Sequence, residues 1–316
     1  MNNNSIENAD SQVLLNKIVL EYMREQKRKR IWRWVFRALI LLIILWVVYQ
    51  LMVMQHYDTG IHSKPHVGLI NIKGTIFANE EANGDNLSKA LDKAYDNKSM
   101  KALILRIDSP GGSPVQADYM YSSVRYYHDK FPNIKIYAVC VDVCASAAYY
   151  LASAADEIYA NPSSLVGSIG VIYNGFGFVD AMQKLGISRR LQTAGRNKGF
   201  MDQFSPTDAA QQKTLQTMLD LIHQQFIAKV KAGRGNRLLI DNDTFSGLFW
   251  TGTQAKERGL IDGFASSGQL ARDTIKIEKI VDYTFKENVF ERVSKSIGTA
   301  MVDQLPTALG IKPGFQ

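Results

Sequence analysis

A chain of 316 residues is long enough for one large domain or two ordinary ones with a sizeable core. Apolar residues make up 46% and charged residues 21%, a balance that excludes a disordered chain. The net charge of +7 is concentrated in residues 1–37, which hold eight Lys/Arg against four acidic residues. The rest of the chain is close to neutral, which argues against a nucleic-acid-binding surface.

The first feature along the chain is an apolar segment, 37–56. Seventeen uncharged residues follow Arg37, and a helix needs about 20 largely apolar residues to span a bilayer. Aromatic residues flank both ends, and the basic run before the segment predicts a cytoplasmic N-terminus. A cleaved signal peptide is disfavoured by a polar lead-in of about thirty residues and by the lack of a small-residue cleavage site. A buried core helix is disfavoured because both faces are apolar. The sequence predicts one uncleaved transmembrane anchor.

Strand and helix patterns alternate after residue 65. Strands are expected at 66–77, 101–107, 134–141, 157–162 and 168–173. Helices are expected at 86–97, 114–131, 146–156, 206–232, 253–259 and 267–275. Strands separated by helices of this length indicate parallel βαβ units. We therefore expect one α/β domain whose functional loops lie at the carboxyl ends of its strands.

Two consecutive strand-to-helix turns carry candidate site residues. The turn Ser-Pro-Gly-Gly ends with Gly111 and Gly112, whose backbone N–H groups can face a cleft beside a helix N-terminus and hold an oxyanion. The next turn holds Ser146, followed by a helix of small residues. In a parallel sheet both turns lie along one edge, which would bring the two glycines and Ser146 together. An ordinary Pro-Gly turn is the alternative reading of the first.

The sequence offers more than one base that could activate Ser146, because no histidine lies within ten residues of it. Of the five histidines, His128 and His223 lie on expected helices, and the dipole of its helix accounts for His128. A Ser-His-Asp triad therefore stays an alternative. A lysine is the other candidate, since desolvation can make its amine neutral and basic. Lys198 lies in a polar, Gly-rich loop, where it could equally be an exposed surface charge.

Two cysteines, Cys140 and Cys144, lie four residues apart around the strand before Ser146. We expect two small buried side chains, as free cysteines usually are. A local disulfide is the alternative, but this spacing at the end of a strand is awkward for its geometry. Without neighbouring histidines the pair does not make a zinc site. The sequence predicts no metal and no cofactor.

Five motifs in a fixed order resemble the signal peptide peptidase A family of membrane-anchored serine proteases. They lie within residues 65–270 and read SPGG, ASAAYY, GSIGV, GRNKGFMDQFSP and GLFWTGTQAKERGLIDGF. The resemblance implies a Clp protease/crotonase-like fold of repeated ββα units. It also implies a Ser/Lys dyad, with Ser146 as nucleophile, Lys198 as general base and Ser168 orienting the lysine. Gly111, next to Gly112, matches the oxyanion-hole donor.

This chain departs from the family pattern directly after the serine, and the resemblance also has an implication for assembly. The family usually has Gly-Gly after the serine, where this chain has Ala147-Ala148, whose methyl groups could narrow the cleft. Family members with one catalytic unit assemble into rings in which neighbouring protomers supply the serine and the lysine. By resemblance, we expect a homo-oligomeric ring that is active only when assembled.

The combined reading divides the chain into five segments: 1–36 cytoplasmic tail, 37–56 anchor, 57–65 linker, 66–275 protease domain and 276–316 C-terminal extension. It predicts a serine endopeptidase on the outer side of the bacterial cytoplasmic membrane, acting on remnant signal peptides or other extended apolar peptides. One alternative is a non-catalytic, membrane-tethered scaffold of the same fold. A crotonase-like acyl-CoA enzyme is another, which the anchor and the outward topology argue against.

Overall fold

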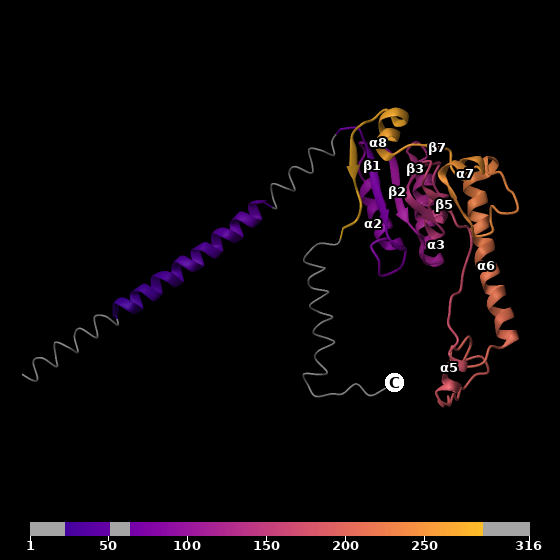
Figure 1. Cartoon of the computed structure of the whole chain (residues 1–316). Helices are drawn as coiled ribbons and strands as arrows, with labels where there is room; N and C mark the ends of the chain where they lie inside the picture. Colours follow the sequence, from indigo (N-terminus) through magenta and orange to yellow (C-terminus); the bar gives the residue numbers. More distant parts are fainter. Residues whose placement is uncertain (1–22, 51–63, 287–316) are drawn as a thin grey trace, which may run out of the picture. The chain divides into compact units, whose positions relative to one another are not determined.

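The computed structural model of the protein describes residues 23–50 and 64–286 (Figure 1). These residues belong to two units that divide between Ser63 and Lys64. Parts of four predicted segments lie outside the described residues. They are the tail before residue 23, the end of the anchor and the linker over 51–63, and the extension beyond 286.

The N-terminal unit contains a helix of 28 residues, Met23–Gln50. This helix is long and apolar enough to cross a membrane, judged by length and composition, and its side chains are exposed. It begins fourteen residues before the expected anchor, because the basic stretch up to Arg37 continues the same helix. Charged residues therefore occupy its first turns and apolar residues its remainder.

The second unit is built on an eight-stranded sheet. Strands β1 (His66–Lys73), β2 (Met100–Ser109) and β3 (Lys135–Ala145) are parallel neighbours at its centre. The order across the sheet is β6-β5-β3-β2-β1-β8, with β5 at Leu165–Gly167, β6 at Phe249–Thr251 and β8 at Ile280–Asp282. Strand β4 (Glu157–Ala160) pairs with β3 and with β7 (Gly263–Phe264). All pairs are parallel except β5 with β6, so the predicted α/β class is confirmed.

Strand β3 has two partners on one side, which matters for the site. Its first half, Tyr137–Cys140, pairs with β4, and its last three residues, Val143–Ala145, pair with β5. Between β2 and β3 the register shifts at the same place, so that Ser109 lies opposite Cys144. The end of β3 is therefore held between β2 and β5, and the chain turns into a helix directly beyond it.

Helices α2 (Gly84–Tyr95), α3 (Pro114–Lys130) and α4 (Ala147–Ala152) follow the three central strands and form one packed layer. Alternate side chains of each strand face this layer, as Leu103, Leu105 and Ile107 of β2 do in the larger core cluster. The other face carries a smaller cluster that includes Ala102 and Ile104 of β2. The π-helix η2 (Leu270–Ile275), which follows the short helix α8 (Ser267–Gln269), contributes Leu270 and Ala271 to this smaller cluster. Helix α7 (Gly252–Glu257) contributes Ala255 to the larger one.

Helix α6 (Ala209–Arg234) is attached to this core by its C-terminal half, whose Phe226, Ile227 and Val230 are buried. The 3-10 turn η1 (Gly235–Arg237) follows it. Arg234 at its last turn has a fully buried side chain that donates two hydrogen bonds to Asp262, at 2.8 and 2.9 Å. The same carboxylate accepts the N–H of Ile158 in β4 at 2.7 Å. One buried ion pair thus joins α6, β4 and the segment before β7.

Three sequence expectations are changed by the structure. The strand expected at 168–173 was wrong, because the strand is β5 at Leu165–Gly167 and the next residues leave the sheet. Strand β8 pairs with β1 over Val67–Leu69, so the sheet continues past residue 275, where we placed the end of the domain. In place of full second strands in the expected ββα units, isolated bridges join Ile76 to Ala82 and to Gly112.

Candidate active site

Ser146 occupies a strained turn between β3 and α4. Its φ is 54°, in the left-handed region that favours glycine, and its ψ is −125°. Its backbone N–H donates to the carbonyl of Gly167 at 2.8 Å, and its carbonyl accepts from Tyr150 at 2.9 Å. The side chain makes no cap bond to α4 and is half-buried. A serine held in a strained backbone with an uncommitted hydroxyl is a candidate nucleophile.

The glycines of the preceding turn pass directly against Ser146. A Cβ placed on Gly111 would lie 2.7 Å from the Cβ of Ser146 and 2.9 Å from the N of Ala147. Gly111 has a φ of 103°, so both its conformation and its contacts require glycine. A Cβ on Gly112 would lie 2.2 Å from the carbonyl oxygen of Ile76. The predicted juxtaposition of the two turns is therefore present in the structure.

The two glycine amides differ in availability. Gly111 N–H donates to Ser109 Oγ at 3.1 Å. Ile76 donates to the carbonyl of Gly111 at 2.9 Å and accepts from Ser113 at 2.8 Å, so the bridge uses the groups on either side of Gly112. Across residues 64–286 no hydrogen-bond partner is found for Gly112 N–H. Ala147 N–H opens α4 and has no intrahelical partner either.

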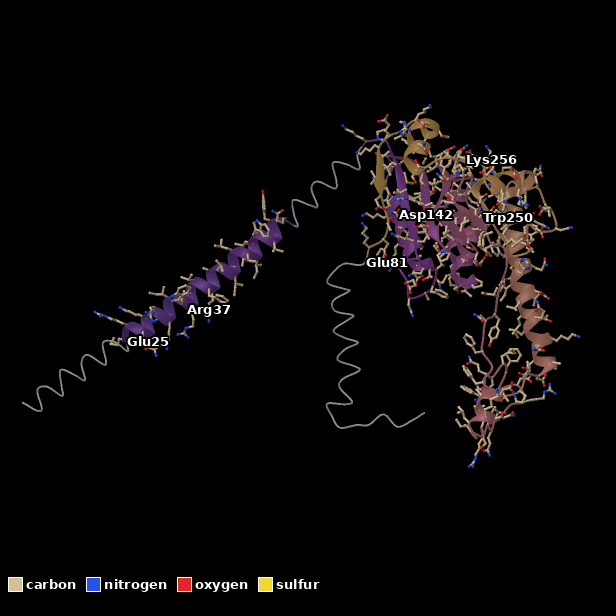
Figure 2. The ribbon with its side chains drawn as sticks, in the orientation of Figure 1. Glu25, Arg37, Glu81, Asp142, Trp250 and Lys256 are labelled. Carbon is tan, nitrogen blue, oxygen red and sulfur yellow. The ribbon has the colours of Figure 1, made fainter. Side chains whose placement is uncertain are left out.

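Ser168 lies on the other side of Ser146, one residue beyond the carbonyl that holds it. Gly167 and Ser168 both have positive φ, 108° and 52°, so the chain turns sharply as it leaves β5. Ser168 N–H donates to the carbonyl of Leu248 at 2.8 Å, just before β6. Trp250, on β6, lies under the turn, since a Cβ on Gly167 would be 3.1 Å from its ring (Figure 2).

The two alanines that replace the family's Gly-Gly belong to the core. Ala147 and Ala148 are buried in the same cluster as the central strands. Tyr149 after them is fully buried and donates from its hydroxyl to the carbonyl of Leu260 at 2.7 Å. The methyl groups therefore help α4 to pack under the Ser146 turn.

Lys198 lies in a different place. It belongs to residues 170–208, here called the arm, which leave the sheet after β5 and return through α6. The arm includes α5 (Val179–Lys184), which lies at the end of α6 remote from the sheet (Figure 1). Lys198 is exposed, and no hydrogen bond or ion pair between described residues joins it to Ser146 or Ser168. One chain thus brings together Gly111, Gly112, Ser146 and Ser168, and not Lys198.

The arm has a small core of its own that orders the loop carrying Lys198. Phe178 stacks on Phe204 with ring centroids 5.3 Å apart, and Phe176 lies beside them. Arg189 covers the ring of Phe204 and pairs with Asp202 at 3.1 Å. These contacts hold the loop between α5 and α6 in a defined shape. Among the described residues, the Lys198 side chain makes no hydrogen bond or ion pair.

The histidines weighed as alternative bases are engaged elsewhere. The two ring nitrogens of His128 lie 2.8 and 2.9 Å from carboxylate oxygens of Asp129 and Asp156. His223 Nε2 lies 2.9 Å from the carbonyl oxygen of Ile169. Among the described residues, neither histidine hydrogen-bonds to Ser146, so no Ser-His arrangement is formed within one chain.

The described part of the sheet carries one further pocket and no evident metal centre. Among residues 23–50 and 64–286, no group of three His, Cys, Asp or Glu side chains could hold a metal ion. A cavity of about 700 Å³ has Arg106 and Asp142 in its lining. None of the five predicted site residues lines it. Cys140 and Cys144 are free and buried, as expected.

Sequence reasoning missed three residues that shape the site. Gly167 supplies the carbonyl that holds Ser146, Ile76 bridges the glycine turn, and Trp250 supports the Ser168 turn. Gly167 and Trp250 lie inside the motifs GSIGV and GLFWTG, so their motifs marked them, but their contacts depend on strand pairing. Ile76 had no signal in the sequence beyond its apolar side chain.

Comparisons with known proteins place these features in a family. Residues 128–280 match the sequence profile of Peptidase family S49. The Na(+)/H(+) antiporter NhaA of Brucella abortus is 40% identical over 216 residues, covering 66% of this chain and 29% of that protein. The chloroplastic serine protease SPPA of Arabidopsis thaliana is 30% identical over 179 residues, covering 56% of this chain and 26% of that protein. This chain spans less than a third of the length of either relative, and no antiporter function is inferred from the first.

A solved structure is also similar. It is a mutant of the 1510-N membrane-bound stomatin-specific protease in complex with a substrate peptide, with a TM-score of 0.45 and 17% identity over 75% of this chain and 99% of that chain. The family profile covers α4 and β4–β7, including Ser146, Ser168 and Lys198. It supports the resemblance carried by the motifs ASAAYY, GSIGV, GRNKGFMDQFSP and GLFWTGTQAKERGLIDGF: these residues match Peptidase family S49, a family of serine proteases.

Proposed function

We propose that the protein is a membrane-anchored serine endopeptidase in which Ser146 and Lys198 form a catalytic dyad. The observation that carries the proposal is the strained Ser146 turn, held by the Gly167 carbonyl and lying against Gly111. Nucleophiles are commonly held in such turns, where the hydroxyl stands clear of the backbone. The family match supports the reaction class, and the geometry of the turn supports the choice of Ser146 as the nucleophile.

In the proposed reaction the Ser146 hydroxyl attacks the carbonyl carbon of a peptide bond. Neutral Lys198 takes the hydroxyl proton as the new C–O bond forms, and delivers it to the leaving amine as the C–N bond breaks. A water molecule then attacks the acyl-enzyme and gives a proton to Lys198. Lys198 returns this proton to the Ser146 oxygen as the ester C–O bond breaks, which releases the acid and regenerates both residues. Ser168, half-buried beside the Ser146 turn, would accept a hydrogen bond from the lysine and orient it.

The oxyanion formed in each step needs donors near Ser146. Gly112 N–H and Ala147 N–H are the candidates, since neither has a partner in the described chain and Gly111 N–H is held by Ser109. Gly111 would instead allow the close approach, which any side chain would prevent. Each such donor contributes about 3 kcal/mol to the transition state in comparable sites. Gly112 and Ala147 would thus donate to the oxyanion, and Gly111 would leave the space that the predicted oxyanion hole needs.

We further propose that the dyad is shared between protomers of a homo-oligomeric ring. In one chain Lys198 belongs to the arm and Ser146 to the sheet. The arm exposes several large apolar side chains, with Ile172 86%, Phe176 74% and Leu185 73% exposed. An apolar surface of this kind is typical of a segment that packs on another subunit. Packing of the arm on a neighbour would bring its Lys198 to that neighbour's Ser146.

The substrates would be extended apolar peptides, such as remnant signal peptides at the membrane. Residues 171–173 lie in no helix or strand, and no hydrogen bond of their backbone groups is present in the described residues. An extended peptide could pair with such backbone groups as a strand pairs with a sheet edge. The basic residues before the apolar helix favour a cytoplasmic N-terminus and a catalytic domain outside the cytoplasm of a bacterial cell.

The experiment mixes inactive variants of the full-length protein in detergent. Ser146→Ala and Lys198→Ala are each expected to abolish cleavage of a fluorogenic apolar peptide. Lys184→Ala, another arm lysine, is the matched control and should keep full activity. After subunit exchange, a mixture of the two inactive variants should recover part of the activity, since some sites then combine an intact serine with an intact lysine. Full activity of Lys198→Ala would contradict the base assignment.

A non-catalytic scaffold of the same fold is the second candidate, favoured by Ala147-Ala148 in place of Gly-Gly. A serine-directed fluorophosphonate probe separates the two. The enzyme proposal requires that Ser146 is labelled in the assembled wild type and not in Lys198→Ala. A wild type that assembles, cleaves nothing and takes up no probe would favour the scaffold.

A further inference from the structure

One titratable side chain beside the site has no role in the proposed reaction. His223 lies on α6, and its Nε2 is 2.9 Å from the carbonyl oxygen of Ile169. A carbonyl oxygen only accepts, so Nε2 carries the hydrogen and donates it. Ile169 is buried and directly follows Ser168. The bond therefore ends one residue from the side chain that would orient the lysine.

His223 also marks the place where α6 meets the body of the domain. From Phe226 onward α6 has buried apolar residues, whereas no residue from Ala209 to Gln225 is buried. On the outgoing side, the chain leaves the sheet after Gly167, and Ile169 lies directly before the arm. The hydrogen bond thus joins the outgoing and returning stems of the arm at its base.

Apolar packing surrounds this bond, since Ile169 is buried in the same core cluster as Phe226 of α6. A Cβ on Gly170 would lie 2.9 Å from the Cα of Gly247, so the outgoing stem passes tightly against the segment before β6. Beyond that point, the two stems are joined next within the arm, where Phe178 N–H donates to the carbonyl of Gln203 and Met201 N–H to Gln211 Oε1. Among the described residues, the His223 bond thus adds a directional polar contact to the apolar packing between α6 and the start of the outgoing stem.

We propose that His223 is a positioning residue that fixes the direction of the arm relative to the Ser168 turn. This inference rests on the proposed function, in which the arm carries Lys198 to a neighbouring Ser146. A small rotation at the base of a long arm displaces its far end by several ångströms, and misplacement of a catalytic group by about 1 Å can lower a rate a hundredfold. One hydrogen bond at the base would thus control the reach of the lysine.

The direct test measures the position of the arm and does not depend on activity. Spin labels are attached at Arg190→Cys on the arm and Glu257→Cys at the end of α7, both exposed. The native cysteines are buried and should not take label. Labelled full-length chains are diluted with unlabelled ones in detergent, so that pulsed electron paramagnetic resonance reports distances within one chain.

Three variants are compared in this background. His223→Gln keeps an N–H donor near the position of Nε2, His223→Leu keeps the bulk without the donor, and Gln224→Leu changes the exposed neighbour on the same helix. We expect a narrow distance distribution for the wild type, His223→Gln and Gln224→Leu, and one at least about twice as broad for His223→Leu. An unchanged distribution in His223→Leu would overturn the proposal.

Peptide cleavage gives a second, independent measurement. His223→Leu should lower kcat by about ten- to a hundredfold, and His223→Gln should stay within about threefold of the wild type. If His223→Gln were inactive while its distance distribution stayed narrow, His223 would carry a proton, and the positioning role would be wrong. If the wild type itself cleaved nothing, the proposed function would fail, while the distance distributions would still decide the role of His223.

Discussion

The backbone N–H of Ser146 donates to the carbonyl oxygen of Gly167 at 2.8 Å, and this bond joins the Ser146 turn to the Ser168 turn. Ser146 and Ser168, on either side of it, are both non-glycine residues with positive φ, 54° and 52°. A left-handed conformation is unfavourable for such residues and persists only where neighbouring contacts impose it. The end of β3, held between β2 and β5, provides those contacts.

Strain at Ser146 predicts a gain in stability when the side chain is removed entirely. Ser146→Gly should raise the free energy of unfolding by about 1 kcal/mol relative to Ser146→Ala, since strain of about 1–3 kcal/mol is relieved and part is offset by the entropy of glycine. Ser146→Ala keeps a Cβ and therefore the strain, which makes it the matched control. Urea unfolding of both variants measures the difference. Equal stabilities would show that the turn is not strained.

Close packing at Gly111 predicts that a single methyl group there disrupts the site. In Gly111→Ala the new Cβ would lie 2.7 Å from both Ala145 O and Ser146 Cβ, at a φ of 103°. We expect peptidase activity to fall by more than about a hundredfold, as when an oxyanion donor is displaced. Gly268→Ala, with open space around it and no positive φ, should retain activity. Circular dichroism of both variants checks the fold.

The buried ion pair between Arg234 and Asp262 predicts a large stability effect. Arg234→Met leaves Asp262 with the single pairing to Arg237, whose side chain is 41% exposed. Removing one partner of a buried pair costs about 3–5 kcal/mol, because the remaining charge stays away from water. Arg272→Met, which breaks the exposed pair with Asp273, should change stability by less than about 1 kcal/mol. Similar losses in both variants would contradict this account.

Acid should weaken the same junction. Burial raises the pKa of Asp262, but the hydrogen bonds from Arg234 and Ile158 N–H and the nearby guanidinium charges outweigh it, so the pKa lies below its usual range. A carboxyl with a lowered pKa in the folded state contributes stability above its unfolded pKa of about 3.9, and loses it as pH falls through the folded value. The free energy of unfolding should therefore fall below about pH 4, with a shallower slope in Asp262→Asn.

The two cysteines should be unreactive in the folded protein. Cys140 and Cys144 are buried, and burial raises the pKa of the Cys144 thiol well above its usual value, so little thiolate forms. A thiol reagent at pH 8 should modify neither residue in the native protein and both in urea. A count below two after unfolding without reductant would indicate a disulfide.

Patterns that repeat over several turns or strand residues predicted most of the sheet and its covering helices. Strands β1 to β4 and helices α2, α3 and α6 each bury a regular set of apolar side chains, which is the signal that periodicity detects. Strands β6, β7 and β8 have two or three residues each, and helix α5 buries none of its residues, so none of these four elements shows a periodic apolar pattern. Their existence depends on partners distant in sequence.

The run from Ser168 to Tyr173 shows why part of the site escaped prediction. Its apolar residues indicate a buried strand, but Ile172 is 86% exposed and the run leaves the sheet. Sequence reasoning placed Ser146, Gly111 and Gly112 at one edge because parallel strands share that edge, whereas Ser168 was identified by the family resemblance. It had no comparable rule for Lys198, since the position of a loop at the end of an arm depends on what the arm contacts.

Strand β8 decides where a shortened version of this protein can end. It pairs with the first residues of β1, and the next two residues continue alongside. Tyr283 N–H donates to the carbonyl of Leu69, and the hydroxyl of Thr284 accepts the N–H of Asn71. A fragment that stopped at residue 275 would leave β1, a strand with an apolar inner face, open along its outer edge. Open edges of this kind pair with other copies and promote aggregation. A fragment for crystallisation or assay should therefore extend at least to Lys286.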